Sequence, residues 1–378
     1  MTKKTRFIIL SACALCFIII APILVLYSMG DRFDFEKFRI TKTGGIYIRT
    51  FPAAEQITID SKITEKPGMF SNSVFVQSLI PDEHTVLIQK NGYYDYFKTL
   101  PVVEEQVTKL ENVLLLRENM QFEVATEEIQ SPFAVQERFI IKKNNLYYSD
   151  ADENIGITAT QKSTPILKGL VSFSFINNDI LWLGTDGILY KSSLSADKIS
   201  NPTKLTTIPI KIIKTGIYKI IPDDKDIFII DNGNLLSLDN KTDELFKFSS
   251  SITDAIISPD NKNIVTYNNN SVYISSIPNA AIGAEIKKNV LLYKSSEKIN
   301  DCIWLNNDYI VLVSGDKIII SEIDHRGNIN AVVLPQTISV STEEKIEVSN
   351  PKIYFNPQER KLYILIDKTL LLSEPIGQ

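Results

Sequence analysis

The chain has 378 residues and a net charge of −5, with acidic and basic residues interspersed along it. That balance leaves no basic face and argues against a nucleic-acid-binding protein. Three cysteines cannot make a disulfide framework, so the chain must fold around ordinary hydrophobic cores, and its length allows more than one.

The first predicted element is a membrane-spanning helix from Phe7 to Tyr27. This uncharged run of about 21 residues is long enough to cross a hydrocarbon core of about 30 Å. Residues 1–6 carry basic charges only, whereas both signs mix after the run, which predicts a cytoplasmic N-terminus. We therefore expect a single-pass anchor in the cell membrane, with the bulk of the chain extracytoplasmic. A signal peptide cleaved before Asp31 is the alternative.

Two cysteines inside this run allow other interpretations. Cys13 and Cys16 have the C-x-x-C spacing of redox and metal sites, but hydrocarbon offers nothing that stabilises a thiolate. The segment "LSAC" (10–13) is similar to a lipoprotein cleavage site, but too few apolar residues precede it and the run continues beyond it. We interpret both cysteines as apolar residues of the helix.

Residues 44–117 predict one small β-sandwich. Apolar and polar positions alternate in "GGIYIRTFP" (44–52), "QITIDS" (56–61) and "HTVLIQKNGYYDYFKTLPVV" (84–103). A period of two between turn signals is typical of half-buried strands. The expected buried faces carry Ile46 with Ile48, Ile57 with Ile59, and Val86 with Ile88.

The same residues resemble the PEGA domain. The matching positions are Pro52, Ile57, Ile59, Asp60, Lys62, Pro81, His84, Val86, Lys90, Gly92 and Tyr93. Ser61 and Asp82 stand where the family has turn glycines, which suggests altered turns, and Tyr96 stands where it has tryptophan. PEGA domains are small extracytoplasmic β-sandwiches without catalytic activity, so the resemblance implies a surface or spacer module and a structural role for His84.

Residues 130–378 predict a β-propeller. Six hairpins recur, each with two short strands around a turn rich in Asn, Asp and Gly, at 139–150, 180–194, 227–240, 264–277, 309–324 and 361–374. Units of about 40 to 50 residues are typical of propeller blades, and six hairpins predict about six blades, with seven as the alternative. The stretch "RENMQFEVATEEIQSPF" before them offers few core positions and is interpreted as a linker between separable domains; the alternative is that its early part supplies an outer strand to the last blade.

One of these units resembles the blade of TolB-type propellers. Ser258, Pro259, Asp260 and Lys262 match the family's S-P-D-G-K turn, and Asn261 stands in place of its glycine. Proline starts a turn and Asp or Asn tolerates its special backbone angles, so the motif specifies a blade and no activity.

No pattern in the sequence predicts catalysis, a metal or a cofactor. Nucleophile-elbow, P-loop and dinucleotide-binding motifs are absent from the sequence. His84 and His325 fall in different predicted domains. The segment "SDADENIG" (149–156) has the acidic spacing of a calcium loop but lacks its glycine and its final glutamate, so we interpret it as a solvated turn.

The sequence therefore favours a non-enzymatic, membrane-anchored binding or scaffold protein of a prokaryotic cell envelope. The expected partner is an unknown protein or an envelope polysaccharide, recognised through one propeller face. Four turns recur at the same place in successive hairpins and are the predicted contact rim; their candidate residues are Asp186, Asn232, Asn269 and Asp316. The alternatives are an exported carbohydrate-active hydrolase on a propeller scaffold and a purely structural envelope component.

Overall fold

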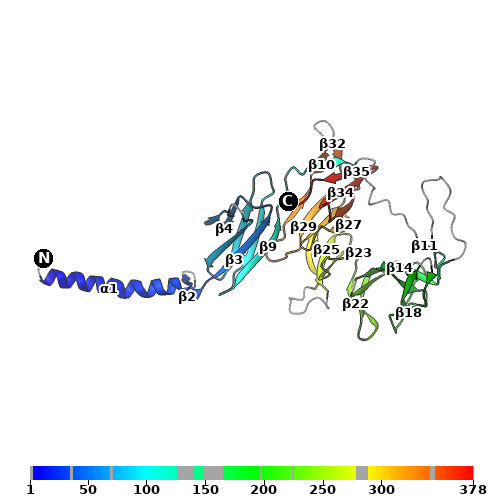
Figure 1. The fold of residues 1–378 in the computed structure, drawn as a ribbon, viewed down its shortest axis with the longest axis horizontal. Coiled ribbons are helices and arrows are strands. Elements are labelled where there is room, and N and C mark those ends of the chain that lie inside the picture. The colour runs from blue at the N-terminus through cyan, green and yellow to red at the C-terminus, as the bar shows by residue number, and fades with distance from the viewer. Residues whose placement is uncertain are drawn as a thin grey trace. The chain divides into compact units, whose positions relative to one another are not determined.

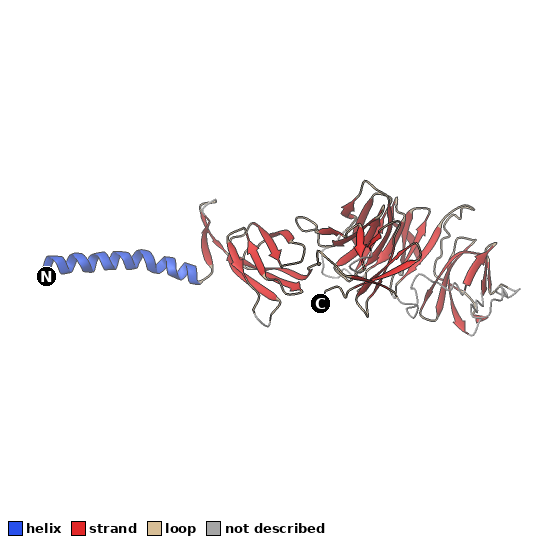
Figure 2. Cartoon of the chain, turned by 90° about the horizontal axis from the view of Figure 1, so that it is seen from above, coloured by secondary structure: helices blue, strands red, loops and turns tan. Residues whose placement is uncertain are grey.

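The computed structural model describes residues 3–34, 37–68, 71–125, 139–148, 165–195, 198–223, 225–277, 288–340 and 345–377. In these described residues one helix is followed by β-strands only (Figures 1 and 2). The chain divides into two compact units. Unit 1 contains Met1–Met120, Asp324–Val332 and Pro375–Gln378, and unit 2 contains Gln121–Ile323 and Val333–Glu374.

The N-terminal helix α1 runs from Lys3 to Ser28 and contains Pro22. Its segment Lys4–Ser28 is long and apolar enough to cross a membrane, and the most apolar stretch of that segment packs against no other part of the chain. The apolar helix expected from Phe7 to Tyr27 is therefore confirmed. A signal sequence passes the same test, so retention and orientation of the helix stay predictions.

Unit 1 also contains a hairpin and two sheets. The hairpin pairs β1 (Asp31–Asp34) with β2 (Arg39–Lys42). The first sheet has the order β6 (Ser73–Leu79), β3 (Gly44–Phe51), β9 (Val107–Leu114), and the second has the order β5 (Ile63–Glu65), β4 (Gln56–Ile59), β7 (Glu83–Gln89), β8 (Tyr96–Pro101).

One hydrophobic core joins these two sheets into a sandwich. Ile46 and Ile48 of β3 belong to the same buried cluster as Ile57 of β4 and Val86 of β7. The intervening Arg49 is exposed, as the period of two requires. The buried faces predicted from the alternation in residues 44–88 are confirmed.

Unit 2 consists of consecutive antiparallel sheets. The first two sheets are β11 (Phe139–Lys142), β12 (Asn145–Tyr148), β13 (Leu167–Lys168), and then β14 (Leu170–Ile176), β15 (Asp179–Gly184), β16 (Leu189–Ser195), β17 (Lys198–Ile199), with β18 (Thr203–Lys204) also on β16. Three four-stranded sheets follow: β19 (Tyr218–Pro222), β20 (Ile227–Asp231), β21 (Asn234–Asp239), β22 (Glu244–Ser250); β23 (Asp254–Ile257), β24 (Asn263–Tyr267), β25 (Ser271–Ser276), β26 (Val290–Lys294); and β27 (Ile299–Trp304), β28 (Tyr309–Ser314), β29 (Lys317–Glu322), β30 (Ala331–Val333). The last two sheets are the pair β31 (Thr337–Ser339), β32 (Lys345–Glu347), and the sheet β10 (Phe122–Val124), β35 (Thr369–Ser373), β34 (Lys361–Ile366), β33 (Lys352–Asn356).

All six predicted hairpins are confirmed as adjacent antiparallel strands. Strands β14, β19, β23, β27 and β33, called the first strands below, each open one sheet. Successive first strands contact each other, β14 with β19 and so on to β33. Sequential four-stranded sheets joined through their first strands are the arrangement of propeller blades. The described residues show no closed ring, so a blade number of six or seven stays a prediction.

The last sheet takes its outer strand from the start of unit 2. β10 pairs with β35, with Phe122 opposite Ser373, and the Phe122 side chain is buried. β10 lies inside the stretch interpreted from the sequence as a linker. The alternative that the start of this stretch supplies an outer strand to the last sheet is therefore the correct one; three residues are too short to show the period of two that would have decided it.

Candidate functional site

The four predicted rim residues occupy equivalent turns of unit 2. Asp186 follows β15, Asn232 follows β20, Asn269 follows β24 and Asp316 follows β28. Each lies between the second and third strands of its sheet, and all four residues are exposed. The structure therefore places the turns equivalently, and their use as a contact surface stays a proposal.

Three of these side chains also hold the local structure around them. Asp186 accepts a hydrogen bond of 2.6 Å from the Tyr190 hydroxyl, which raises the pKa of Tyr190 to about 12. Asn232 Oδ1 accepts one of 3.0 Å from the backbone amide of Ile217, and Asp316 Oδ1 accepts one of 2.7 Å from the amide of residue 350. Replacing them therefore affects local structure as well as any ligand.

A charged cluster lies on three neighbouring first strands. Lys219 of β19 donates to both carboxylate oxygens of Asp254 on β23, at 2.7 Å each. Asp301 of β27 is close enough for the Asp254 charge to act on it. Each aspartate also accepts a hydrogen bond of 2.8 Å from the amide of the residue that follows it, which fixes its rotamer.

The two aspartates have different electrostatic environments. Burial raises the pKa of Asp301, and the Asp254 charge raises it further, against the lowering effects of the Cys302 amide and of Lys219. Burial and the same two carboxylates raise the pKa of Tyr267, which lies opposite Asp254 in the ladder. The arrangement combines one neutralised ion pair with one carboxyl group that holds its proton more tightly than usual.

The rim turns and the charged cluster lie at the same end of the sheets. Asn232 binds the amide of Ile217, directly before β19, and Lys219 is the second residue of that strand. The carbonyl of Asn269 accepts a hydrogen bond of 2.7 Å from Ile299, the first residue of β27, which carries Asp301. We call these four turns together with Lys219, Asp254 and Asp301 the turn-end surface.

The charged cluster was not predicted from the sequence. Its signal is the repeated "TDAI" (253–256) and "NDCI" (300–303), in which an aspartate starts or nearly starts a first strand. The third cysteine, Cys302, is buried beside it, and burial raises the pKa of its thiol. That environment keeps the thiol protonated and unreactive.

The TolB-like turn lies between β23 and β24 and is held by its own side chains. The Ser258 hydroxyl donates to Asp260 at 2.7 Å and accepts from the amide of Asn263 at 2.9 Å. Asn261 has a φ of 57°, the left-handed angle for which the family uses glycine. The structural role predicted for this motif fits these contacts.

His84 in the sandwich is also held by its own chain. Its Nδ1 lies 2.6 Å from Asp60 Oδ2 and its Nε2 lies 2.7 Å from the carbonyl oxygen of Ile80. Partial burial acts to raise the pKa of Asp60, but hydrogen bonds from His84 and Thr85 outweigh it and hold that pKa below its usual value. These contacts fit the structural role predicted for His84.

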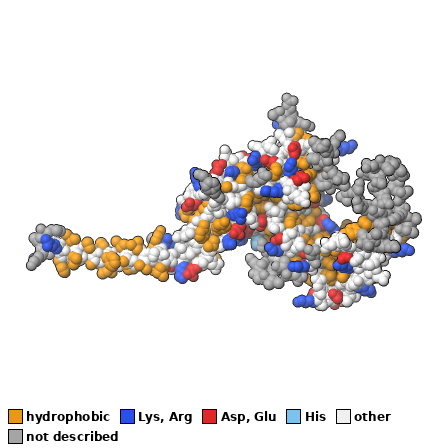
Figure 3. All heavy atoms as spheres, viewed as in Figure 1, with side chains coloured by type: hydrophobic (Ala, Val, Ile, Leu, Met, Phe, Trp, Pro, Cys, Tyr) orange, Lys and Arg blue, Asp and Glu red, His pale blue; other side chains and the backbone are white. Residues whose placement is uncertain are grey.

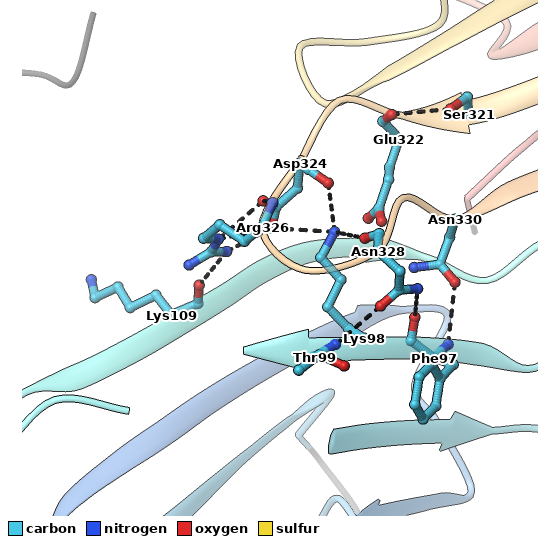
Figure 4. Close-up of polar contacts among 10 residues, drawn as sticks. All are labelled: Phe97, Lys98, Thr99, Lys109, Ser321, Glu322, Asp324, Arg326, Asn328 and Asn330. Carbon is cyan, nitrogen blue, oxygen red and sulfur yellow. Dashed lines mark hydrogen bonds and ion pairs between the residues drawn. The ribbon is translucent and has the colours of Figure 1, made fainter. Parts of the chain in front are cut away.

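Another polar cluster, this one in unit 1, surrounds Lys98 of β8 (Figure 4). The Lys98 side chain is fully buried, and its Nζ donates to the carbonyl oxygens of Asp324 and Asn328 at 2.5 and 2.8 Å. The Asp324 carboxylate lies 3.9 Å from Nζ. Burial acts to raise the pKa of Asp324, but the hydrogen bonds from Arg326 and the Lys98 charge hold it below its usual value.

Side-chain amides of the same segment cover the backbone of β8, an edge strand. Asn328 accepts from the Thr99 amide at 3.1 Å and donates to the Phe97 carbonyl at 2.7 Å, while Asn330 accepts from the Phe97 amide at 3.2 Å. A neighbouring strand would make the same bonds. We call this set of contacts between residues 324–330 and β8 the β8 clamp. It closes an edge that would otherwise be open to pairing.

No group of His, Cys, Asp and Glu side chains able to hold a metal ion occurs in the part of the chain that the structure describes. The acidic segment 149–156, interpreted as a solvated turn, lies outside the described residues.

Comparison with known proteins gives structural likeness only. No protein-family model matches the chain, and no curated protein is similar to it. Similar solved structures include a functionally unknown protein from Desulfotomaculum acetoxidans, with 13% identity, a TM-score of 0.40, and coverage of 62% of this chain and 74% of that one. BamB from Moraxella catarrhalis has 11% identity and a TM-score of 0.37, with 78% and 82% covered. The computationally designed protein Ika8 has 12% identity and a TM-score of 0.38, with 77% and 93% covered. Scores this low carry no argument about what the chain does.

Proposed function

We propose that this protein is a membrane-anchored, non-enzymatic binding or scaffold protein of a prokaryotic cell envelope. In this proposal α1 is a retained anchor with its N-terminus in the cytoplasm, residues 44–117 are a PEGA-type spacer, and unit 2 is a TolB-like propeller of about six blades. The apolar helix and the sandwich that follows it support this order of parts.

The observation that carries the proposal is the turn-end surface. Lys219, Asp254 and Asp301 project from neighbouring strands of a rigid scaffold, next to exposed polar turns. Polar groups fixed on rigid strands lose little entropy when a partner binds, so they suit recognition. Mixed charge favours a partner with polar and charged groups, such as an envelope protein or an acidic or amino-bearing polysaccharide.

The test of this proposal is a binding measurement with charge variants. Full-length protein in detergent would be incubated with isolated cell-wall polysaccharide, and separately with solubilised envelope proteins followed by chemical cross-linking. We expect Lys219→Gln and Asp301→Asn to weaken retention, whereas Glu123→Gln, which removes an ion pair on β10, should not. Equal retention of all three variants would contradict the assignment of the turn-end surface.

Orientation needs a separate test. Protease added to intact cells should digest the chain beyond about residue 30 if the extracytoplasmic position is right. A protected chain, or a mature N-terminus at Asp31, would contradict the retained, outward-facing anchor.

A second candidate function is supported by the Asp254–Asp301 pair. Two nearby carboxyl groups, one of which keeps its proton, are what a glycoside hydrolase needs for its acid and base. Both carboxylate oxygens of Asp254 are, however, already bound by Lys219, so Asp254 is not free to activate a water molecule. Release of reducing sugars from cell-wall polysaccharide, abolished by Asp301→Asn, would favour this hydrolase over the binding protein.

A further inference from the structure

The hairpin that follows the apolar helix exposes a compact apolar patch. Phe33 of β1 lies directly opposite Ile40 of β2, so their side chains share one face of the hairpin. The Phe33 ring also meets Phe38 edge-on, with centroids 6.4 Å apart. The exposed fractions are 44% for Phe33, 56% for Ile40 and 81% for Phe38.

This hairpin is fastened to the end of the helix. Arg32 donates to the carbonyl oxygen of Tyr27 at 2.9 Å and lies over the Tyr27 ring, 3.4 Å from its centroid. The amide and hydroxyl of Thr43 both donate to the carbonyl oxygen of Gly30. The patch is therefore held within a few residues of the segment that is long enough to cross the membrane.

The basic side chains of the hairpin other than Arg32 pair with acidic residues of the sandwich. Lys37 pairs with Asp82 at 3.0 Å, and Lys42 pairs with Glu105. These pairs neutralise the charges of Lys37 and Lys42. What the hairpin leaves uncovered is the apolar face.

We propose that the patch formed by Phe33, Phe38 and Ile40 lies in the interface of the membrane that α1 spans, inserted among the lipid headgroups. This inference rests on the proposed anchor. Transfer of apolar and aromatic side chains from water into the boundary between headgroups and acyl chains is favourable, and side chains next to a membrane-spanning helix are within reach of that boundary. The occupant of the patch is lipid because the hairpin that carries it is fastened to the end of α1, whose side chains are apolar and exposed along the helix (Figure 3). Such contact fixes the sandwich at the membrane surface.

Single tryptophan substitutions in the full chain test this arrangement. The protein would be reconstituted in phosphatidylcholine vesicles with and without lipid brominated near the headgroup end of the acyl chains. Quenching is read as the difference from the unsubstituted chain, which has two tryptophans of its own. The variants are Phe38→Trp in the patch, Leu15→Trp inside the helix, and Phe75→Trp on β6, where the native side chain is 46% exposed.

We expect brominated lipid to reduce the added fluorescence of Phe38→Trp about twofold and to leave that of Phe75→Trp unchanged. If Leu15→Trp is quenched and Phe38→Trp is not, the helix spans the membrane but the patch does not touch it, and the inference is overturned while the anchor stands. If Leu15→Trp is not quenched, the anchor fails and the inference fails with it. Quenching of Phe75→Trp as well would overturn the assignment to this hairpin. A spectrum of Phe38→Trp that changes with protein concentration in lipid-free detergent would identify a second copy as the occupant.

Discussion

Replacing Lys98 with methionine should open the β8 clamp. Methionine keeps most of the apolar stem of the fully buried side chain but removes the ammonium group that binds the carbonyl oxygens of Asp324 and Asn328. Each hydrogen bond from a charged donor contributes about 1.5–3 kcal/mol, and relief of the buried lysine charge offsets part of that loss. We expect the free energy needed to open residues 324–330 away from β8 to fall by about 3 kcal/mol.

Hydrogen exchange of the β8 amides measures this opening directly. The amides of Phe97 and Thr99 are bonded to Asn330 and Asn328, so they exchange when the segment leaves the strand. A loss of about 3 kcal/mol corresponds to about 100-fold faster exchange of a peptide that covers 96–101.

The matched control is Lys109→Met, which removes a lysine whose side chain is 65% exposed and leaves its backbone bond to Arg326 intact. Its exchange rate should match that of the unsubstituted protein. Unchanged exchange in Lys98→Met would refute the reasoning that the ammonium group holds the clamp closed.

Three further predictions concern the sandwich and the last sheet. Ser61 has a φ of 55°, so Ser61→Gly should stabilise the sandwich by about 1 kcal/mol in calorimetry, whereas Asp82→Gly, at a position without positive φ, should not. Folding lowers the pKa of Asp60, so the contribution of its carboxylate to stability is complete above pH about 4 and is lost as the pH falls through the folded-state pKa. The stability difference between the unsubstituted protein and Asp60→Asn should therefore shrink in acid. A difference that grows in acid would contradict the pairing of Asp60 with His84. A fragment of residues 119–378 should unfold at a higher temperature than one of residues 130–378, because the shorter one lacks β10 and leaves the edge of β35 unpaired; equal melting would show that β10 is dispensable.

The hairpins and the buried faces of the sandwich could be predicted because both depend on local pattern. Alternation places Ile46 and Ile48 on one face whatever the neighbouring strands are, and a turn rich in Asn and Gly marks where a strand pair reverses. The two positions that replace turn glycines behaved differently. Ser61 keeps the left-handed angle, while Asp82 does not.

The charged cluster could not be predicted because it depends on which strands become neighbours. Lys219 and Asp254 are 35 residues apart, and only the contact of β19 with β23 brings them together. Lys98 did leave a signal in the sequence. It alternates in phase with Tyr96 and Leu100, two buried apolar residues, so a period of two assigns a lysine to a buried face. A buried lysine requires acceptors, and sequence alone does not say that residues 324–328 supply them.

The β8 clamp and strand β10 explain why domain boundaries are hard to draw along this chain. Unit 1 includes Asp324–Val332, which lies between β29 and the end of β30 in the chain, and unit 2 begins at Gln121, before the predicted linker ends. Boundaries drawn from the sequence give each unit one continuous segment. In the structure, the carbonyl oxygens that bind Lys98 come from residues more than 200 positions away in the chain. Residues 44–117 alone would therefore lack the carbonyl oxygens that bind the Lys98 ammonium group. The sandwich core is local to that segment, but the polar groups that satisfy its edge are not.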